Sequence, residues 1–416
     1  MTLDNERLAA IWRIESPKLV ATLMRSVRDL GVAEELAQDA FVAALAQWPD
    51  EGIPRNPGAW LMAVGKRRAL DRIRRDAAFD RKQQIVSADV ESALLDPGFD
   101  VVEREIEDDL LRLVFTACHP MLAQEARVAL TLRLLGGLTT AEIARAFLSS
   151  ESTVAQRIVR AKRTLAQARV PFEVPVDRER LERLASVLEV VYLIFNEGYA
   201  ATSGDDVLRP ELCNDAMRLG RVLAGLMPSE PEVHGLLALM ELQASRSSAR
   251  TDQRGAPVLL ADQDRVRWDG VLIAHGLKAL AQAELLGGTA GPYTLQAEIA
   301  ACHARAATFA RTDWARVAAL YDALAERMPS AVVRLNRAVA AGMAFGAETG
   351  LRLSDELSQE PVLRDYHLLP AVRAEFLERL GRFSEAAPEF ARAAQLAGNQ
   401  RERTLLFERA ARCRIS

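Results

Sequence analysis

The segment from Leu122 to Arg169 constrains the fold of this chain most, because its apolar residues keep helical spacing through two short breaks. The sequence predicts a helix, a break at Gly136–Gly137, a short helix over Thr140–Leu148, a polar turn and a long basic helix from about Ser152, with Ser150 or Ser152 as its cap. Two helices joined by a short turn are typical of a helix-turn-helix, whose second helix enters the major groove of DNA.

The outer face of the basic helix carries side chains suited to DNA. Gln and Arg can form paired hydrogen bonds with adenine and guanine edges, and later cations are better placed for phosphates. The predicted DNA contacts are Ser152, Thr153, Gln156, Arg157, Arg160, Lys162 and Arg163. Taken alone, the segment also fits an amphipathic helix pair with a solvated basic face, because such patterns recur by chance.

Charge is segregated along the chain, although the net charge of its 416 residues is only −4. Trp60–Lys82 holds eight basic and three acidic residues, 8 − 3 = +5, and Leu122–Arg169 gives the same sum, 8 − 3 = +5. Between them, Asp89–Asp109 holds one Arg and nine acidic residues, 1 − 9 = −8. Two basic modules around an acidic tether favour a polyanionic partner.

The composition indicates an all-α protein. Ala, Leu, Arg and Glu dominate, aromatic residues make up 6%, and half of the chain is hydrophobic, which is enough for several cores. The four cysteines are far apart, and neither a signal peptide nor an apolar run of membrane length is visible, so we expect a cytoplasmic protein with reduced thiols. Cys118–His119 and Cys302–His303 have no second pair at ligand spacing, so no metal or other cofactor is expected.

Helical spacing also runs from Leu8 to Trp48, with a break near Gly31 and with Pro17 in a position to start a helix of its own. The second part shows an acidic and polar edge formed by Glu34, Glu35, Gln38 and Asp39, beside Leu36, Phe41 and Val42. This edge suits a basic partner protein, and a solvated face is the alternative. Pro49–Pro57 predicts a loop, followed by a helix with a cationic side that Asn56 or Gly58 caps.

Together these segments resemble the extracytoplasmic-function sigma factors of bacterial RNA polymerase. AEELAQDAFVAALAQW (Ala33–Trp48) is similar to their region 2.2, NPGAWLMAVGKRRALDRIRR (Asn56–Arg75) to regions 2.3 and 2.4, and Leu122–Arg169 to region 4. No region 1.1 or region 3 is visible, and an acidic linker occupies the expected place.

The resemblance implies a role for each segment. Core RNA polymerase would bind through its β′ coiled coil and its β flap, and the residues implied on the region 2.2 side are Glu35, Gln38, Asp39, Phe41 and Val42. The minus-ten element would be melted and read by Arg55, Asn56, Trp60, Lys66, Arg67, Asp71 and Arg74. The basic helix would read the minus-thirty-five element of promoter DNA.

A long extension follows VPFEVP (Val170–Pro175). It begins with an apolar stripe of Leu181, Leu184, Leu188, Val191 and Phe195, after which Gly198 suits a helix C-cap. Further on, Arg334–Leu357 and Arg373–Leu396 align at an offset of 39, each with two helices around a Gly turn. With YLIFNEGYAAT and ADQDRVRWD, these hairpins resemble the sigma-factor group that has a long tetratricopeptide-like C-terminal extension.

The sequence therefore predicts a region 2 domain over residues 1–80, an extended or partly disordered acidic linker over 81–108, a region 4 domain over 109–170, and a helical extension over 171–416. We expect the extension to contact the sigma domains of its own chain and to regulate them in cis. A stand-alone helix-turn-helix regulator with a helical sensor domain is the alternative, but it leaves the basic Trp60–Lys82 module without a purpose. An enzyme is disfavoured, since neither a phosphate-binding loop nor an HExxH, GxSxG or Ser/His/Asp arrangement is present.

Overall fold

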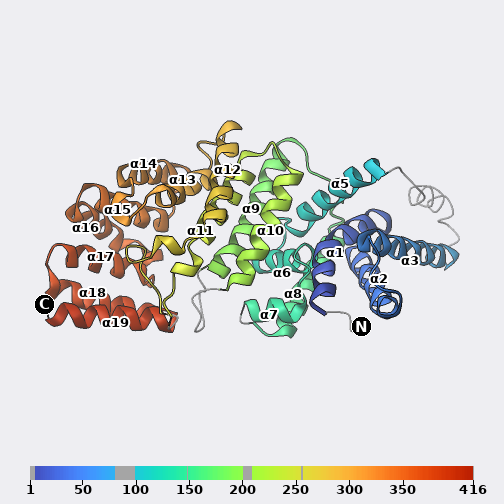
Figure 1. Cartoon of the computed structure of the whole chain (residues 1–416), viewed down its shortest axis with the longest axis horizontal. Coiled ribbons are helices and arrows are strands. Elements are labelled where there is room, and N and C mark those ends of the chain that lie inside the picture. Colours follow the sequence, from blue (N-terminus) through green and yellow to red (C-terminus); the bar gives the residue numbers. More distant parts are fainter. Residues whose placement is uncertain (1–4, 80–98, 148, 200–208, 254–255, 416) are drawn as a thin grey trace. The chain divides into compact units, whose positions relative to one another are not determined.

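α-Helices make up the regular structure of this computed structural model, so the predicted all-α class is confirmed (Figure 1). The structure describes residues 5–79, 99–147, 149–199, 209–253 and 256–415. Within these ranges a single isolated bridge joins Thr251 and Pro257, and no β-sheet forms. The chain divides into an N-terminal unit, Met1–Leu193, and a C-terminal unit, Ile194–Ser416.

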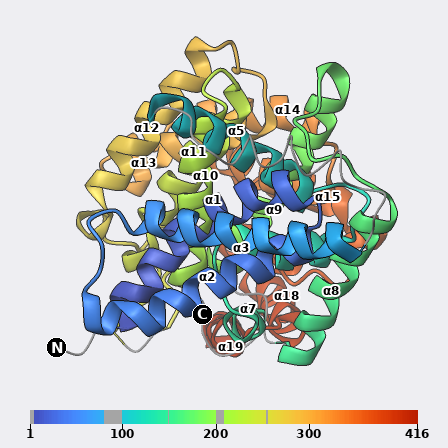
Figure 2. The ribbon, with the colours of Figure 1, turned by 90° about the vertical axis from the view of Figure 1, so that its right-hand side faces the viewer.

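Three long helices begin the N-terminal unit: α1 (Asn5–Val27), α2 (Leu30–Glu51) and α3 (Pro57–Phe79). They lie side by side, in blue in both ribbon views (Figures 1 and 2), around the fully buried side chains of Leu23, Trp48 and Leu61. α1 runs unbroken through Pro17, so the expectation of two helices is wrong. A proline removes one helix hydrogen bond, and the packing of α1 against its two neighbours outweighs that loss.

Helix α5 (Phe99–Ala117) replaces the last part of the predicted tether. The sequence predicted an extended segment up to residue 108, and this is wrong from Phe99 onward. Residues 81–98 of the predicted linker lie outside the described residues. α5 packs against α1 and buries Leu110, Leu113 and Val114, so an apolar stripe stabilises a helix that its acidic composition had concealed.

The helix-turn-helix follows as α6 (Gln124–Leu134), α7 (Thr140–Ala146) and α8 (Glu151–Gln167), in agreement with the predicted pattern. Thr139 and Glu142 form a capping box on α7. Ser150 caps α8, its Oγ accepting a hydrogen bond from the Thr153 amide at 3.1 Å. Gly137 has a φ of +69°, and a Cβ there would lie 2.9 Å from the Cα of Arg13, so the turn before α7 passes directly over α1.

Helix α9 (Asp177–Tyr199) spans the boundary between the two units. Its stripe is buried at Leu184, Leu188, Val191 and Phe195, whereas Leu181 is 60% exposed.

The prediction that Gly198 caps α9 is wrong, because Gly198 lies inside the helix. A Cβ at this position would lie 2.7 Å from the Cys213 amide nitrogen, so glycine lets α9 and the next helix approach each other closely.

The C-terminal unit consists of consecutive helices that pack largely on their neighbours in sequence. They are α10 (Pro210–Leu226), α11 (Pro231–Ala244), α12 (Gly270–Leu285), α13 (Pro292–Arg305), α14 (Trp314–Arg327), α15 (Ala331–Phe345), α16 (Ala347–Glu356), α17 (Leu368–Arg379), α18 (Phe383–Leu396) and α19 (Gln400–Ile415). Short 3-10 turns lie at Ser247–Ala249, Arg265–Arg267, Phe309–Arg311, Leu357–Gln359 and Pro361–Leu363. The two segments that aligned at an offset of 39 contain the helix pairs α15–α16 and α17–α18.

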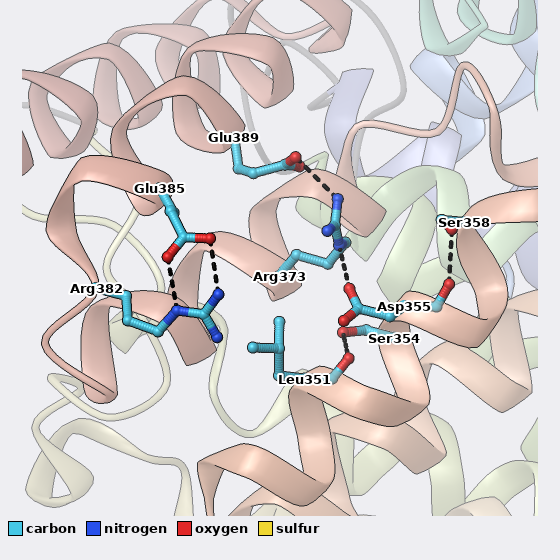
Figure 3. Close-up of polar contacts among 8 residues, drawn as sticks. All are labelled: Leu351, Ser354, Asp355, Ser358, Arg373, Arg382, Glu385 and Glu389. Carbon is cyan, nitrogen blue, oxygen red and sulfur yellow. Dashed lines mark hydrogen bonds and ion pairs between the residues drawn. The ribbon is translucent and has the colours of Figure 1, made fainter.

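Polar side chains join successive helices of these pairs (Figure 3). Arg373 of α17 donates from Nε to Asp355 of α16 at 2.8 Å and from Nη1 to Glu389 of α18 at 2.8 Å. Arg382 forms a paired contact with Glu385, with both distances 2.7 Å. Arg373 therefore links three helices, beside a core in which the Phe376 and Phe390 rings are fully buried.

The four cysteines are buried and unpaired. Burial raises the pKa of the Cys118 thiol to about 11 and that of Cys213 to about 12, which leaves both protonated at neutral pH. Over the described ranges, no helix is long and apolar enough to cross a membrane, and no three His, Cys, Asp or Glu side chains are grouped to hold a metal ion.

Candidate nucleic-acid interface

The DNA-reading face predicted on α8 points away from the core of the N-terminal unit. Val154, Ile158, Ala161 and Leu165 form the buried side of the helix. On the other side the exposed residues are Ser152, Thr153, Gln156, Arg160 and Arg163, with Arg157 and Lys162 half-buried. The hydroxyls of Ser152 and Thr153 lie 3.0 and 2.7 Å from the Ser150 hydroxyl at the capped end of α8. One helix surface thus presents hydroxyl, amide and guanidinium groups together.

Lys162 differs from the other members of this face because its charge is already paired. Its ammonium contacts Glu34 of α2, whose other carboxylate oxygen accepts a hydrogen bond from Nε of Arg133 at 2.6 Å. Gln38 also donates to Glu34, at 2.9 Å. The sequence placed Glu34 on a polar edge of α2, and that placement is wrong, since the residue is only 6% exposed.

Glu34 stays ionised although it is buried. Burial by itself would raise the pKa of its carboxyl group, but the charges and hydrogen bonds of Lys162 and Arg133 outweigh that effect and lower the pKa below its ordinary value. The three residues come from α2, α6 and α8, so they tie the α1–α3 bundle to the helix-turn-helix. We call these three residues the Glu34 triad.

Further ion pairs join the bundle to the helix-turn-helix and to α5, the helix that precedes it. Arg13 of α1 donates to Glu142 of α7 at 2.9 Å. Arg25 of α1 lies 3.2 Å from Glu105 and 3.5 Å from Asp109, both on α5. The bundle and the helix-turn-helix therefore contact each other at several points, an arrangement we call the closed form.

The cationic side of α3 holds most of the residues predicted for the minus-ten element. Arg55, Asn56, Arg67, Asp71 and Arg74 are exposed, while Trp60 and Lys66 are half-buried. Asn56 caps α3 by accepting a hydrogen bond from the Ala59 amide at 3.0 Å, and Trp60 packs edge-on against Trp48 at 5.3 Å. Burial and the charge of Arg25 lower the pKa of Lys66, although Glu105 and Asp109 act in the opposite direction.

The face of α2 predicted to bind polymerase is partly engaged within the bundle. Glu35, Asp39 and Val42 are exposed, Val42 by 60%, and Gln38 and Phe41 are half-buried. Asp39 forms an ion pair with Arg68 of α3 at 3.3 Å, and the Phe41 ring lies 4.8 Å from the ring of Trp12. This leaves Val42, with Leu45 at 45% exposure, as an apolar strip bordered by carboxylates.

Side chains from the first part of α9 donate hydrogen bonds to carbonyl groups at the end of α5. A helix leaves its last carbonyl groups without partners, and here the Phe115 carbonyl accepts from Arg183 at 2.9 Å and the Cys118 carbonyl from Ser186 at 2.6 Å. Arg127 of α6 adds an ion pair with Glu189 at 3.0 Å. Sequence reasoning missed Arg183 and Ser186, because nothing local indicates a partner 68 residues away.

Three family models match the chain. Residues 11–79 match the model described as Sigma-70 region 2, residues 112–165 match Sigma-70, region 4, and residues 183–284 match a family of unknown function, DUF6596. No solved structure matches this chain.

Curated proteins related in sequence extend these matches. An uncharacterized protein of Rhizobium meliloti (strain 1021) is 42% identical over 390 residues, which cover 93% of this chain and 91% of that protein. The probable ECF RNA polymerase sigma factor SigI of Mycobacterium tuberculosis is 29% identical over 43% of this chain and 61% of its own length. The ECF RNA polymerase sigma factor SigK of Mycobacterium bovis is 29% identical over 39% of this chain and 85% of its own length. With sigma-70 regions 2 and 4 in this order, the chain belongs to the family of the Rhizobium meliloti protein and is an RNA polymerase sigma factor.

Proposed function

We propose that this sigma factor reads the minus-thirty-five element with α8 and the minus-ten element with α3, while α2 docks on core polymerase. The outward face of α8 carries this proposal: Gln156 and Arg160 are exposed, Arg157 is half-buried, and all three follow a capped helix N-terminus. A stand-alone regulator would bind DNA through α8 alone, which does not explain the exposed cations of α3. Transcription of a promoter by purified core enzyme with and without this chain separates the two functions.

Promoter reading is tested on a library of promoter variants. Arg157→Ala should cost about 1–3 kcal/mol of discrimination at one or two minus-thirty-five positions, whereas Arg163→Ala, a phosphate contact, should weaken all promoters alike. Lys162→Ala should also act on all promoters, but it breaks the Glu34 triad as well, so Arg163 is the cleaner comparison. Equal losses at every position for Arg157→Ala and Arg163→Ala would refute base reading by Arg157.

Polymerase docking is tested on the exposed part of α2. Asp39→Lys together with Val42→Lys should abolish co-purification with core polymerase and leave the helical content unchanged, because both side chains are exposed. Phe41 is less suitable, since its ring packs on Trp12 and its removal also perturbs the bundle. Gln47→Lys, exposed on the same helix, is the matched control. Unchanged binding in the double variant would move the interface elsewhere.

We further propose that the extension regulates the sigma domains in cis through α9. Arg183 and Ser186 support this, since they donate to carbonyl groups at the end of α5, directly before the helix-turn-helix. Arg183→Gln with Ser186→Ala should change promoter output while core binding persists. Arg178→Gln, whose side chain is 91% exposed on the same helix, is the control. Identical output from all three proteins would argue against this route.

A further inference from the structure

A cavity of about 860 Å³ lies inside the N-terminal unit, between the end of α1 and the C-terminal half of α8. One wall is apolar and contains Met24, Leu30, Leu165, Val170 and Phe172. The charged residues that line the cavity are five cations and one carboxylate: Arg25, Arg28, Lys162, Arg163, Arg169 and Asp29. This volume falls in the usual range of small-molecule pockets, about 300–1,000 Å³.

Three of these cations are available to a ligand. Arg25 pairs with Glu105 and Asp109, and Lys162 pairs with Glu34. Asp29 is engaged as the cap of α2, where it accepts from the Val32 amide at 2.9 Å. Arg28, Arg163 and Arg169 are exposed and form no ion pair with any described residue. The cavity therefore has excess positive charge, which attracts an anion with several negative charges.

Two of these three arginines have a left-handed backbone conformation. Among the described residues, positive φ values outside glycine occur at Arg28 (54°) and Arg169 (49°), and both line this cavity. Each follows the last turn of a helix, where the Arg28 amide donates to the Met24 carbonyl at 2.9 Å and the Val170 amide to the Leu165 carbonyl at 3.1 Å. Glycine is the usual residue at this position of a helix end. Glycine can therefore replace Arg28 or Arg169 without backbone strain, so such a change removes the guanidinium group alone.

We propose that this cavity binds a small polyanion of nucleotide size, a phosphate chain that carries an apolar or aromatic group. The phosphates would lie on Arg28, Arg163 and Arg169, since guanidinium groups bind phosphate oxygens in pairs. The apolar group would lie against Leu30 and Phe172. The ligand would bind only to the closed form, because some of the cations lie at the end of α1 and the others lie on α8 or directly after it.

Binding at this place opposes DNA binding by the same helix. A ligand that binds only one form of a protein shifts the population toward that form. Bound polyanion would therefore hold the bundle and the helix-turn-helix together and would occupy Arg163, a predicted phosphate contact. This effect on transcription rests on the proposed function, whereas the binding itself does not.

The experiment uses the full chain, with ATP and inorganic tripolyphosphate as probes in calorimetry and thermal unfolding. ATP should bind saturably and raise Tm, and tripolyphosphate should bind more weakly because it lacks the apolar group. Arg28→Gly and Arg169→Gly should each weaken ATP binding about tenfold, the effect expected of one lost charged hydrogen bond. Glycine suits both backbone positions, so Tm without the probe should not fall. Arg145→Gly, an exposed cation on α7 outside the cavity, changes charge equally and should bind ATP as the wild type does.

Three outcomes overturn the proposal. The first is the absence of saturable binding of both probes in the millimolar range. The second is ATP binding that is unchanged in both glycine variants, which would place the nucleotide elsewhere. Binding of promoter-free duplex DNA that depends on Arg28 and Arg169, with no ATP binding, would assign the cavity to nucleic acid instead. If ATP binds as expected but leaves transcription unchanged, the cavity stands and the proposed link to transcription fails.

Discussion

Neutralising Glu34 should open the N-terminal unit. Base pairs of DNA repeat every 3.4 Å, so minus-ten and minus-thirty-five elements centred about 25 base pairs apart are separated by about 85 Å. If the two parts read these elements as proposed, a bundle and a helix-turn-helix that touch through the Glu34 triad cannot contact both elements at once. Glu34→Gln keeps the shape of the side chain and removes the charge that holds Arg133 and Lys162 together.

The size of the expected loss of stability follows from how deeply the ion-paired side chains are buried. Breaking a buried ion pair costs about 3–5 kcal/mol. The side chain of Glu34 is 9% exposed, but those of Arg133 and Lys162 are 20% and 22% exposed, so water compensates part of the loss. We therefore expect the closed form to lose about 2–3 kcal/mol, which lowers its population relative to a form in which the two parts have separated by about 30- to 160-fold.

Single-molecule energy transfer measures this change directly. Dyes on cysteines introduced at Ala46 of α2 and Val159 of α8, both exposed, report the distance between the two parts, and the native thiols are buried. Glu35→Gln, its exposed neighbour, is the control. The closed form should also weaken as pH falls below about 4.5, because a lowered pKa contributes stability only while the carboxylate is ionised.

Coupling within the triad provides the decisive check. A double-mutant cycle of Glu34→Gln and Lys162→Met should give an interaction energy of about 1 kcal/mol or more, since the two groups are in contact. The reasoning would be refuted if the free-energy changes of the two variants were additive. It would also be refuted if the distribution of energy-transfer efficiencies of Glu34→Gln matched those of the wild type and of Glu35→Gln.

Three further predictions concern stability. Gly198→Ala should destabilise the C-terminal unit by about 1–3 kcal/mol, because its Cβ would lie 2.7 Å from backbone, whereas Gly225→Ala on α10, with nothing within 4 Å, should be neutral or stabilising by denaturant unfolding. Burial and the charges of Arg246 and Arg265 lower the pKa of His303 to about 4. The free energy of unfolding of the unit should therefore fall by up to about 3 kcal/mol as pH falls from 6.5 to 4. In His303→Gln this part of the dependence of Tm on pH should disappear. Ser150→Ala should cost about 1 kcal/mol through loss of the α8 cap, measured as a lower midpoint in urea, while Ser152→Ala serves as the control.

Local patterns predicted much of the N-terminal unit. Helix periodicity and capping rules act over a few residues, so α6, α7 and α8 follow from the sequence itself. Ser150 and Asn56, the caps that form, were each one of two candidates that the sequence offered. The outward face of α8 follows from the same periodicity. These are the features for which local and tertiary preferences agree.

The remainder depends on partners distant in sequence. Glu34 meets Arg133 and Lys162 across 99 and 128 residues, and an acidic residue on a helix edge gives no sign of such partners. The same holds for Gly198, where a rule about helix ends competes with the close approach of the Cys213 backbone. Acidic composition concealed α5, whose buried face outweighs the charges of its exposed face.

Helix α9 bears on how chimaeric sigma factors can be built from this chain. The match to region 4 ends at residue 165 and the match to the family of unknown function begins at 183, which invites a fusion point between them. A junction there would detach Arg183 and Ser186 from the carbonyl groups that they satisfy at the end of α5. A transplanted region 4 should therefore carry α9 as far as Leu193, where the N-terminal unit ends. The structural unit that contains region 4 therefore extends beyond its sequence match, into a helix where the match to the other family begins.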